Sequence, residues 1–219
     1  MSEAMTESLA ANPIRRSPFE GHVAGGQASA VGQMGVRLHA FTLPGVVQIA
    51  TWPSATAAME QALAGALAAP DGSLPQRTGQ VAELAPGRLM RTGPHEFMLV
   101  ASTDEPDMVG ALRLHIPCDV GTVTDLGHAR CRIRISGDAC LATLTKLFAL
   151  DFRAAAFAVG EMRLTGHHHV PCCLHRRAQD CFDVYVLTSY AHDQLATLMD
   201  AAREFGVTLD LGADPAAQG

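Results

Sequence analysis

Short apolar segments with strand character alternate along the chain with alanine-rich segments of helical spacing. Residues 46–52 (VVQIATW) favour a strand, and the following ATAAMEQALAGALAA has the composition and 3.6-residue period of a helix. Two short strands, GRLMRT and EFMLVA, flank the turn Gly93-Pro94, and TDEPDMVGALRLH predicts a second helix that Thr103 or Asp104 would cap. A strand is expected at 122–126. The first half therefore reads β-α-β-β-α followed by a strand.

The second half repeats this order. ARCRIRIS alternates as a strand, and ACLATLTKLFAL has the pattern of a helix. The segments AFAVGEMRLTG, HVPCCLHR and CFDVYVL then predict strands, and SYAHDQLATLMDAAREFG predicts the closing helix. Val47 in the first half aligns with Cys131 at an offset of 84 residues, and Phe97 aligns with Phe182 at an offset of 85. Two anchors with nearly the same offset indicate a pseudo-duplicated β-α-β-β-α unit.

The pattern divides the chain into four regions. Residues 1–36, rich in Gly, Ala, Ser and Gln, predict an extended arm that would order against a partner. Residues 37–120 and 121–210 are the two expected halves, and 211–219 form a loose tail.

Composition and charge exclude several classes of protein. With 219 residues and 48% hydrophobic content the chain can bury a sizeable core. The net charge is -6 and no Lys/Arg cluster occurs, which argues against a nucleic-acid partner. The sequence shows no secretory signal and no apolar run of about 18 residues. We therefore expect a cytoplasmic protein that does not bind a membrane. The six cysteines would there be reduced thiols.

The segment GHHHVPCCLHRR, residues 166–177, concentrates metal-ligating side chains. On one strand, His169, Cys173 and His175 would share a face and could hold zinc together with Cys181. Alternatively, residues 166–169 form a hairpin turn whose histidines point to solvent, with Cys172 or Leu174 in the core. Pro171 and the absence of a paired C-x-x-C or H-x-x-x-H motif favour the hairpin, so no metal site is predicted.

Other polar motifs have simple structural explanations. Asp125 and His128 could perform acid/base chemistry or form a turn. Ser136-Gly137-Asp138 could bind an anion at a helix start or cap that helix. Neither a dinucleotide fingerprint, a G-x-S-x-G motif nor a P-loop occurs. No catalytic residue and no cofactor-binding residue is therefore predicted, which indicates a structural or binding subunit.

Several segments of both halves carry a resemblance to a known family. The motif residues of the second half include Asp125, His128, Arg130, Ser136, Gly137, Phe182, Asp183, Ser189 and Tyr190. The first half contributes GVVQIATWP and a G-P-x-E-F-x-L-V segment that includes Gly93, Pro94 and Glu96, and Arg16-Ser17-Pro18 in the arm is similar too. With these residues the chain resembles the gamma subunits of heterotetrameric sarcosine oxidase, over roughly residues 15 to 207.

The resemblance implies a fold and a role. Gamma subunits resemble the folate-binding aminomethyltransferase of the glycine cleavage system, an α+β fold with two ferredoxin-like β-α-β-β-α halves in tandem. Their complexes oxidise sarcosine or other N-methyl amino acids and pass the one-carbon unit to tetrahydrofolate. The expected partners are alpha, beta and delta subunits, which would hold FAD, FMN, NAD, tetrahydrofolate and zinc. This chain would itself be noncatalytic and would brace the alpha subunit.

Two alternatives belong to other classes. The chain could be a stand-alone folate-binding protein similar to aminomethyltransferases, although it is short for that family. It could also be a small metal-binding module, which would retain zinc through residues such as His169 and Cys173.

Overall fold

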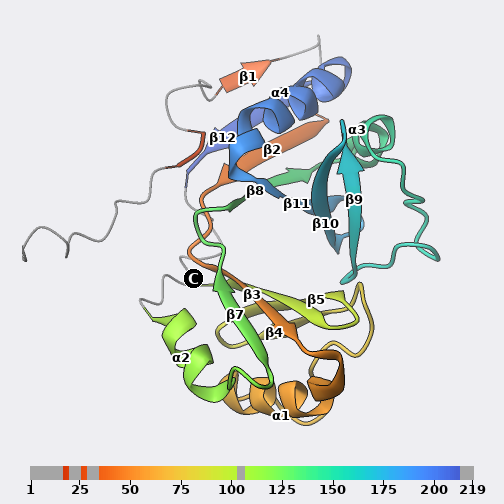
Figure 1. Cartoon of the computed structure of the whole chain (residues 1–219). Helices are drawn as coiled ribbons and strands as arrows, with labels where there is room; N and C mark the ends of the chain where they lie inside the picture. Colours follow the sequence, from red (N-terminus) through yellow and green to blue (C-terminus); the bar gives the residue numbers. More distant parts are fainter. Residues whose placement is uncertain (1–16, 20–25, 29–34, 103–106, 213–219) are drawn as a thin grey trace, which may run out of the picture.

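The computed structural model describes residues 17–19, 26–28, 35–102 and 107–212, and these residues form two β-sheets with helices on both outer sides (Figure 1). The expected α+β class is therefore confirmed. The predicted arm and tail fall largely outside the described residues. Within the described residues, no helix has the length and apolarity needed to cross a membrane.

The first sheet has five strands in the order β4-β5-β6-β3-β7, and every neighbouring pair is antiparallel. The helices α1 and α2 cover one of its faces, where they share a core with β3, β5 and β6. A 3-10 turn at Pro53–Ala55 leads into α1. The bounds are β3 Val46–Thr51, α1 Thr56–Ala66, β4 Val81–Leu84, β5 Gly87–Gly93, β6 Glu96–Ala101, α2 Met108–His115 and β7 Gly121–Asp125.

The second sheet has seven strands in the order β1-β12-β2-β8-β11-β10-β9, and only the β12 and β2 pair is parallel. The helices α3 and α4 cover its outer face. The 3-10 turns Thr188–Tyr190 and Arg203–Phe205 flank α4. The bounds are β1 Gly26–Ala28, β2 Val36–Phe41, β8 Arg130–Ser136, α3 Cys140–Leu147, β9 Met162–His167, β10 Val170–Ala178, β11 Cys181–Leu187, α4 Ala191–Ala202 and β12 Val207–Leu211.

The inner faces of the two sheets pack against each other. Met90, Met98 and Val100 of the first sheet form one buried cluster with Cys173 and Tyr185 of the second. The layers therefore run helix, sheet, sheet, helix (Figure 1). Alternation along each strand sends one set of side chains to the helices and the other set into the space between the sheets.

Sheet membership does not follow the expected boundary at residues 120 and 121. β7 lies in the range of the second half but completes the first sheet by pairing with β3. β2 lies in the range of the first half but enters the second sheet between β12 and β8. Periodicity identifies strands but carries no information on which strand they pair with, because pairing depends on distant backbone hydrogen bonds.

Two points of the predicted arm that the structure describes lie against the body of the protein. Phe19 is buried in the core beneath α3 and α4, and β1 pairs with β12. The expected cap of the second helix is a further correction, since α2 begins at Met108 with Asp107 accepting a hydrogen bond from the backbone N–H of Gly110 at 3.2 Å. Thr103 and Asp104 lie outside the described residues.

Candidate functional site

The histidine-rich segment forms a tight hairpin between β9 and β10. His168 and His169 occupy its two turn positions with φ of 48° and 65°, and Val170 pairs with His167. A two-residue hairpin turn of this kind requires positive φ at both positions. The two turn histidines are exposed, as expected for a hairpin tip.

His167 differs from the expectation that the turn histidines point to solvent. Its ring is buried, packs against Phe148 with a centroid distance of 5.2 Å, and places Nδ1 2.7 Å from Oε1 of Gln194 on α4. β9 continues to His167 rather than ending before Gly166, so this side chain still belongs to a strand face that a helix covers.

The four metal-ligand candidates do not converge. In the pairing register, Cys173 lies opposite Tyr185 and His175 opposite Asp183, whereas Cys181 lies opposite Ala178. Cys181 lies four positions along β11 from Tyr185, the partner of Cys173, a distance of about 13 Å along a strand. His169 lies in the turn beyond the strand. Among the described residues, no group of three or more His, Cys, Asp and Glu side chains could hold a metal ion.

The neighbouring cysteines are buried thiols with raised pKa values. Burial raises the pKa of Cys131 to about 12 and that of Cys172 to about 11. It also raises the pKa of Cys173. Because the thiolate is the reactive form, these side chains are poor nucleophiles. Cys172 and Leu174 lie in the core under the helices, whereas Cys173 faces the first sheet.

Asp125 is the last residue of β7, and His128 lies in the turn that follows it; both are exposed. The Asp125 carboxylate accepts a hydrogen bond from the backbone N–H of Gly127 at 2.7 Å, which is the bond of an Asx turn. Gly137 has φ of 110° and lies so close to β2 that a Cβ atom there would be 2.5 Å from the Gly35 carbonyl oxygen. Ser189 and Tyr190 form the 3-10 turn before α4. These motif residues therefore have structural roles in the turns that connect strands and helices.

Between the sheets, β8 presents a row of three arginines. Its alternation places Arg130, Arg132 and Arg134 toward the first sheet and the apolar residues between them toward the helices. Asp183 on β11 is fully buried and pairs with two of the three. It accepts two hydrogen bonds from Arg134, at 2.7 and 3.1 Å, and lies 3.6 Å from Arg132.

The charge cluster also connects the two sheets. Arg88 on β5 lies 4.0 Å from the Asp183 carboxylate, donates to the Tyr185 hydroxyl at 3.3 Å, and pairs with Glu83. Burial alone would raise the pKa of Asp183, but Arg132, Arg134 and Arg88 outweigh it and lower that pKa. The carboxylate is therefore held ionised in the interior.

His175 borders the same cluster. Burial, and then the positive charge of Arg88, lower the pKa of His175 to about 4. Burial raises the pKa of the neighbouring Tyr185 to about 12. Both side chains are therefore neutral near pH 7.

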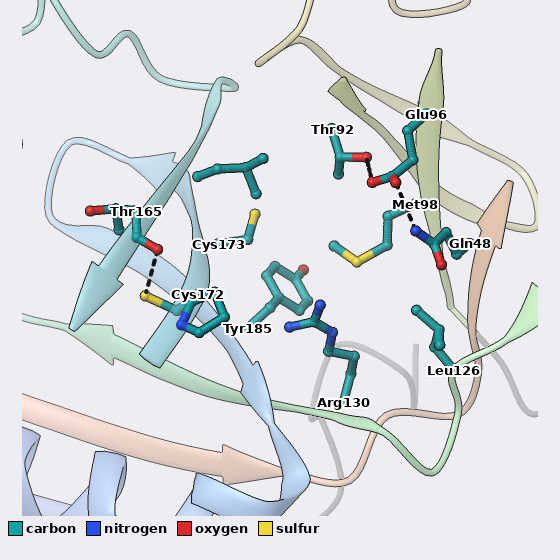
Figure 2. A pocket seen from close by; sticks show the side chains of 12 residues that line it. Gln48, Thr92, Glu96, Met98, Leu126, Arg130, Thr165, Cys172, Cys173 and Tyr185 are labelled. Carbon is teal, nitrogen blue, oxygen red and sulfur yellow. Dashed lines mark hydrogen bonds between the residues drawn. The ribbon is translucent and has the colours of Figure 1, made fainter. Parts of the chain in front are cut away.

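A cavity of about 240 Å³ lies beside this cluster, between the two sheets (Figure 2). The first sheet contributes Gln48, Thr92, Glu96 and Met98, and β8 and β11 of the second contribute Arg130 and Tyr185. The lining is completed by Leu164 and Thr165 of β9, by Pro171, Cys172 and Cys173 of β10, and by Leu126 in the connection before β8.

Its charged groups are one carboxylate, which receives two hydrogen bonds, and one guanidinium. Glu96 accepts hydrogen bonds from Nε2 of Gln48 at 2.7 Å and from Oγ1 of Thr92 at 2.6 Å (Figure 2). Arg130 extends into the space from β8, and within the described chain its buried Nε has no hydrogen-bond partner. The arrangement suits binding of a small polar molecule rather than covalent chemistry.

The sequence pattern did not point to this cavity. Glu96 and Arg130 occur among the residues that carry the family resemblance, but nothing in the sequence predicted that they line one space. Gln48, Thr92 and Tyr185 were not singled out as site residues. The alternating arginines of ARCRIRIS are the sequence signal that could indicate this site. When one face of a strand is charged and lies between two packed sheets, the charged side chains require partners there.

Comparison with known proteins adds the family context. No protein-family model matches the chain, and no curated protein matches it in sequence. Among solved structures, it is similar to a chain of heterotetrameric sarcosine oxidase from Corynebacterium sp. U-96, determined in complex with pyrrole 2-carboxylate. The TM-score is 0.74 at 26% identity, over 87% of this chain and 96% of that chain.

A second likeness concerns the fold alone. The glycine cleavage system aminomethyltransferase T from Bartonella henselae matches 81% of this chain and 48% of its own length, with a TM-score of 0.56 and 15% identity. The sarcosine oxidase match, by contrast, spans nearly the whole of both chains, as the sequence resemblance predicted. The chain is therefore a gamma-subunit-like protein of the heterotetrameric sarcosine oxidase type.

Proposed function

We propose that this chain is a noncatalytic gamma-type subunit of a flavin-dependent oxidase complex that acts on sarcosine or another N-methyl amino acid. In this role it braces a large alpha subunit during oxidative demethylation and one-carbon transfer to tetrahydrofolate. The observation that carries the proposal is the likeness to a chain of heterotetrameric sarcosine oxidase over 87% of this chain and 96% of that chain.

The site geometry supports a noncatalytic role. The thiols of Cys131, Cys172 and Cys173 are buried and hard to ionise. The charge cluster around Asp183 is paired within the chain, where the carboxylate meets Arg132 and Arg134 of its own sheet and Arg88 of the other sheet. The proposed partners are alpha, beta and delta subunits, which would hold FAD, FMN, NAD, tetrahydrofolate and zinc.

We further infer that the two sheet and helix units are variants of one ferredoxin-like β-α-β-β-α unit. The first has the order β5-β6-β3-β7, and the second has β10-β11-β8-β12 once the inserted β2 is set aside. β3 and β8 begin at Val46 and Arg130, an offset of 84 residues, and β6 and β11 begin at Glu96 and Cys181, an offset of 85.

The proposal is tested by producing the chain with the candidate alpha, beta and delta subunits encoded beside it and purifying through a tag on the alpha subunit. The expected result is a yellow assembly that contains this chain in fixed proportion and oxidises an N-methyl amino acid. Omitting the chain should lower the melting temperature or the recovery of the alpha subunit. An assembly that forms and works equally well without the chain contradicts the bracing role.

The same preparation discriminates the alternatives. The isolated chain is expected to be colourless, inactive and without calorimetric binding of tetrahydrofolate. Micromolar tetrahydrofolate binding by the isolated chain would favour a stand-alone folate-binding protein. Stoichiometric zinc that is lost in His169→Ala or Cys173→Ala would favour a metal-binding module.

A further inference from the structure

We propose that the cavity between the two sheets binds a small amino acid with an apolar body, whose carboxylate contacts Arg130 and whose ammonium group faces Glu96. The proposed function places no ligand in this chain, so this site goes beyond it and stands independently of it. It rests on the unequal pairing of the β8 arginines, on the carboxylate across the cavity, and on the lining between them.

The first step concerns Arg130. Of the three arginines on the inner face of β8, Arg132 and Arg134 both lie against the Asp183 carboxylate. Arg130 stands at the cavity end of the row and forms no ion pair within the described residues, where its buried Nε also has no hydrogen-bond partner. A buried donor without a partner is unfavourable, and a charged one is more so. A ligand carboxylate is the group that a guanidinium pairs with best.

The positive charge of Arg130 also acts on the neighbouring thiols. Burial raises the pKa values of Cys131, Cys172 and Cys173, and in all three the positive charge of Arg130 opposes that rise. Two of these cysteines, Cys172 and Cys173, line the cavity. The guanidinium therefore acts on the cavity wall itself.

The second step concerns the opposite sheet. Glu96 is held by the donors of Gln48 and Thr92, which direct one hydrogen bond to each carboxylate oxygen. Each carboxylate oxygen can accept a further bond, so the group can still receive an ammonium donor. No ion pair within 4 Å joins Glu96 to Arg130 in the described chain, and the two opposite charges face the cavity from different sheets (Figure 2).

The third step concerns size and lining. The lining also includes Met98, Leu126, Tyr185 and Pro171, which offer apolar contact. The volume of about 240 Å³ is below the range of about 300–1,000 Å³ that is usual for drug-sized ligands. A compact zwitterion with an aliphatic body is complementary to the two charged groups of the cavity and is small enough to fit its volume.

Met98 offers a local probe, because its side chain lines the cavity. Methyl-13C methionine is incorporated into this full-length chain only, either alone or within its assembly, and the Met98 resonance is assigned with Met98→Leu. Met59, a buried residue of α1 in the other core, reports on the integrity of the fold. Three probes of similar ring size are titrated: L-proline, cyclopentanecarboxylate, which lacks the amine, and pyrrolidine, which lacks the carboxylate.

L-proline is expected to shift the Met98 methyl resonance saturably, cyclopentanecarboxylate to bind more weakly, and pyrrolidine to leave it unchanged. Arg130→Gln should weaken binding of both carboxylates at least about tenfold, while Arg77→Gln, an exposed arginine outside the cavity, should not. Glu96→Gln should reduce the preference for L-proline over cyclopentanecarboxylate. The Met59 resonance should stay in place in every variant.

Several results would overturn the inference. It fails if L-proline produces no saturable shift of Met98, if pyrrolidine binds as well as L-proline, or if Arg130→Gln keeps full affinity. If cyclopentanecarboxylate binds as tightly as L-proline, or if Glu96→Gln leaves their ratio unchanged, the site is one for simple carboxylates and the amino acid assignment is wrong.

Discussion

The Asp183 carboxylate accepts two hydrogen bonds from the Arg134 guanidinium in the interior between the two sheets, at 2.7 and 3.1 Å. Arg132 and Arg88 lie near the same carboxylate, at 3.6 and 4.0 Å, so one negative charge serves three arginines from both sheets. Removing one partner of a buried ion pair leaves uncompensated charge, which is far more costly than losing an exposed pair.

Asp183→Asn is therefore expected to lower the free energy of unfolding by about 3–5 kcal/mol. Urea unfolding at neutral pH, followed by circular dichroism, measures the change. Asp151→Asn is the matched control, because Asp151 pairs with Arg153 on the surface. That variant should leave the unfolding midpoint unchanged. Equal stability of the Asp183 and Asp151 variants would contradict the structural role of the buried cluster.

His175 should make the chain less stable in mild acid. Its pKa is about 4 in the folded chain, against 6.5 for an unperturbed histidine, because burial disfavours the charged ring. The unfolded chain therefore takes up a proton that the folded chain excludes, and stability falls as the pH drops from about 6.5 to about 4. The gap between the two pKa values corresponds to roughly 3 kcal/mol.

Unfolding free energies measured between pH 7 and pH 4.5 test this expectation. His175→Gln should flatten the decline relative to the unchanged protein, whereas His115→Gln, at an exposed position of α2, should not. Asp183 adds a further loss only at lower pH, because its lowered pKa removes stability as the pH falls below the usual 3.8 of an aspartate. An identical pH profile for both histidine variants would argue against a buried neutral His175.

Substitutions in the β9-β10 hairpin turn should increase the stability of the chain. His168 and His169 hold positive φ, which Asn and Gly adopt more readily in a two-residue turn. The double substitution His168→Asn with His169→Gly should stabilise the chain by about 0.5–1 kcal/mol, measured by thermal unfolding. His169→Val, a β-branched residue at the same position, should destabilise it. A stabilising His169→Val would show that the turn has another conformation.

Chelation should leave the protein unaffected. His169 lies in the hairpin turn, Cys173 and His175 lie on β10, and Cys181 lies at the far end of the β10-β11 pairing, so the four do not form one ligand set. EDTA is therefore expected to change neither the melting temperature nor the circular dichroism spectrum of tag-free protein. A fall in melting temperature that zinc restores would contradict this geometry.

Two glycine substitutions should act in opposite directions. A Cβ atom at Gly121 would lie 2.2 Å from the Ala50 carbonyl oxygen and 2.5 Å from Cε of Met59, so Gly121→Ala must displace β7 or α1 and should destabilise the chain. Gly65, in helix α1, has nothing within 4 Å of the same position. Gly65→Ala should stabilise the chain by up to about 1 kcal/mol, because alanine has the higher helix propensity. Thermal unfolding of both variants measures the contrast.

The local pattern of the sequence determined the order of the helices α1–α4 and of the strands β3 and β5–β11, together with the offset between the two halves, but it did not indicate β1, β2, β4 or β12. ARCRIRIS is an alternating strand because successive side chains point to opposite faces, a property of the backbone that needs no partner. Pro171 and the absence of a paired metal motif favoured a hairpin turn over residues 166–169, and the structure places that turn at His168 and His169. The family resemblance added the type of protein, which the structural likeness to a sarcosine oxidase chain confirms.

Tertiary structure decided everything that depends on pairing between distant segments. Hydrogen bonding placed β2 between β12 and β8 and assigned β7 to the first sheet, although both lie across the expected boundary. The packing of one sheet on the other enclosed the arginine face of β8 and brought Glu96 and Arg130 to one cavity. Side-chain periodicity specifies which residues share a face, but only the register and the opposing layer specify what that face meets.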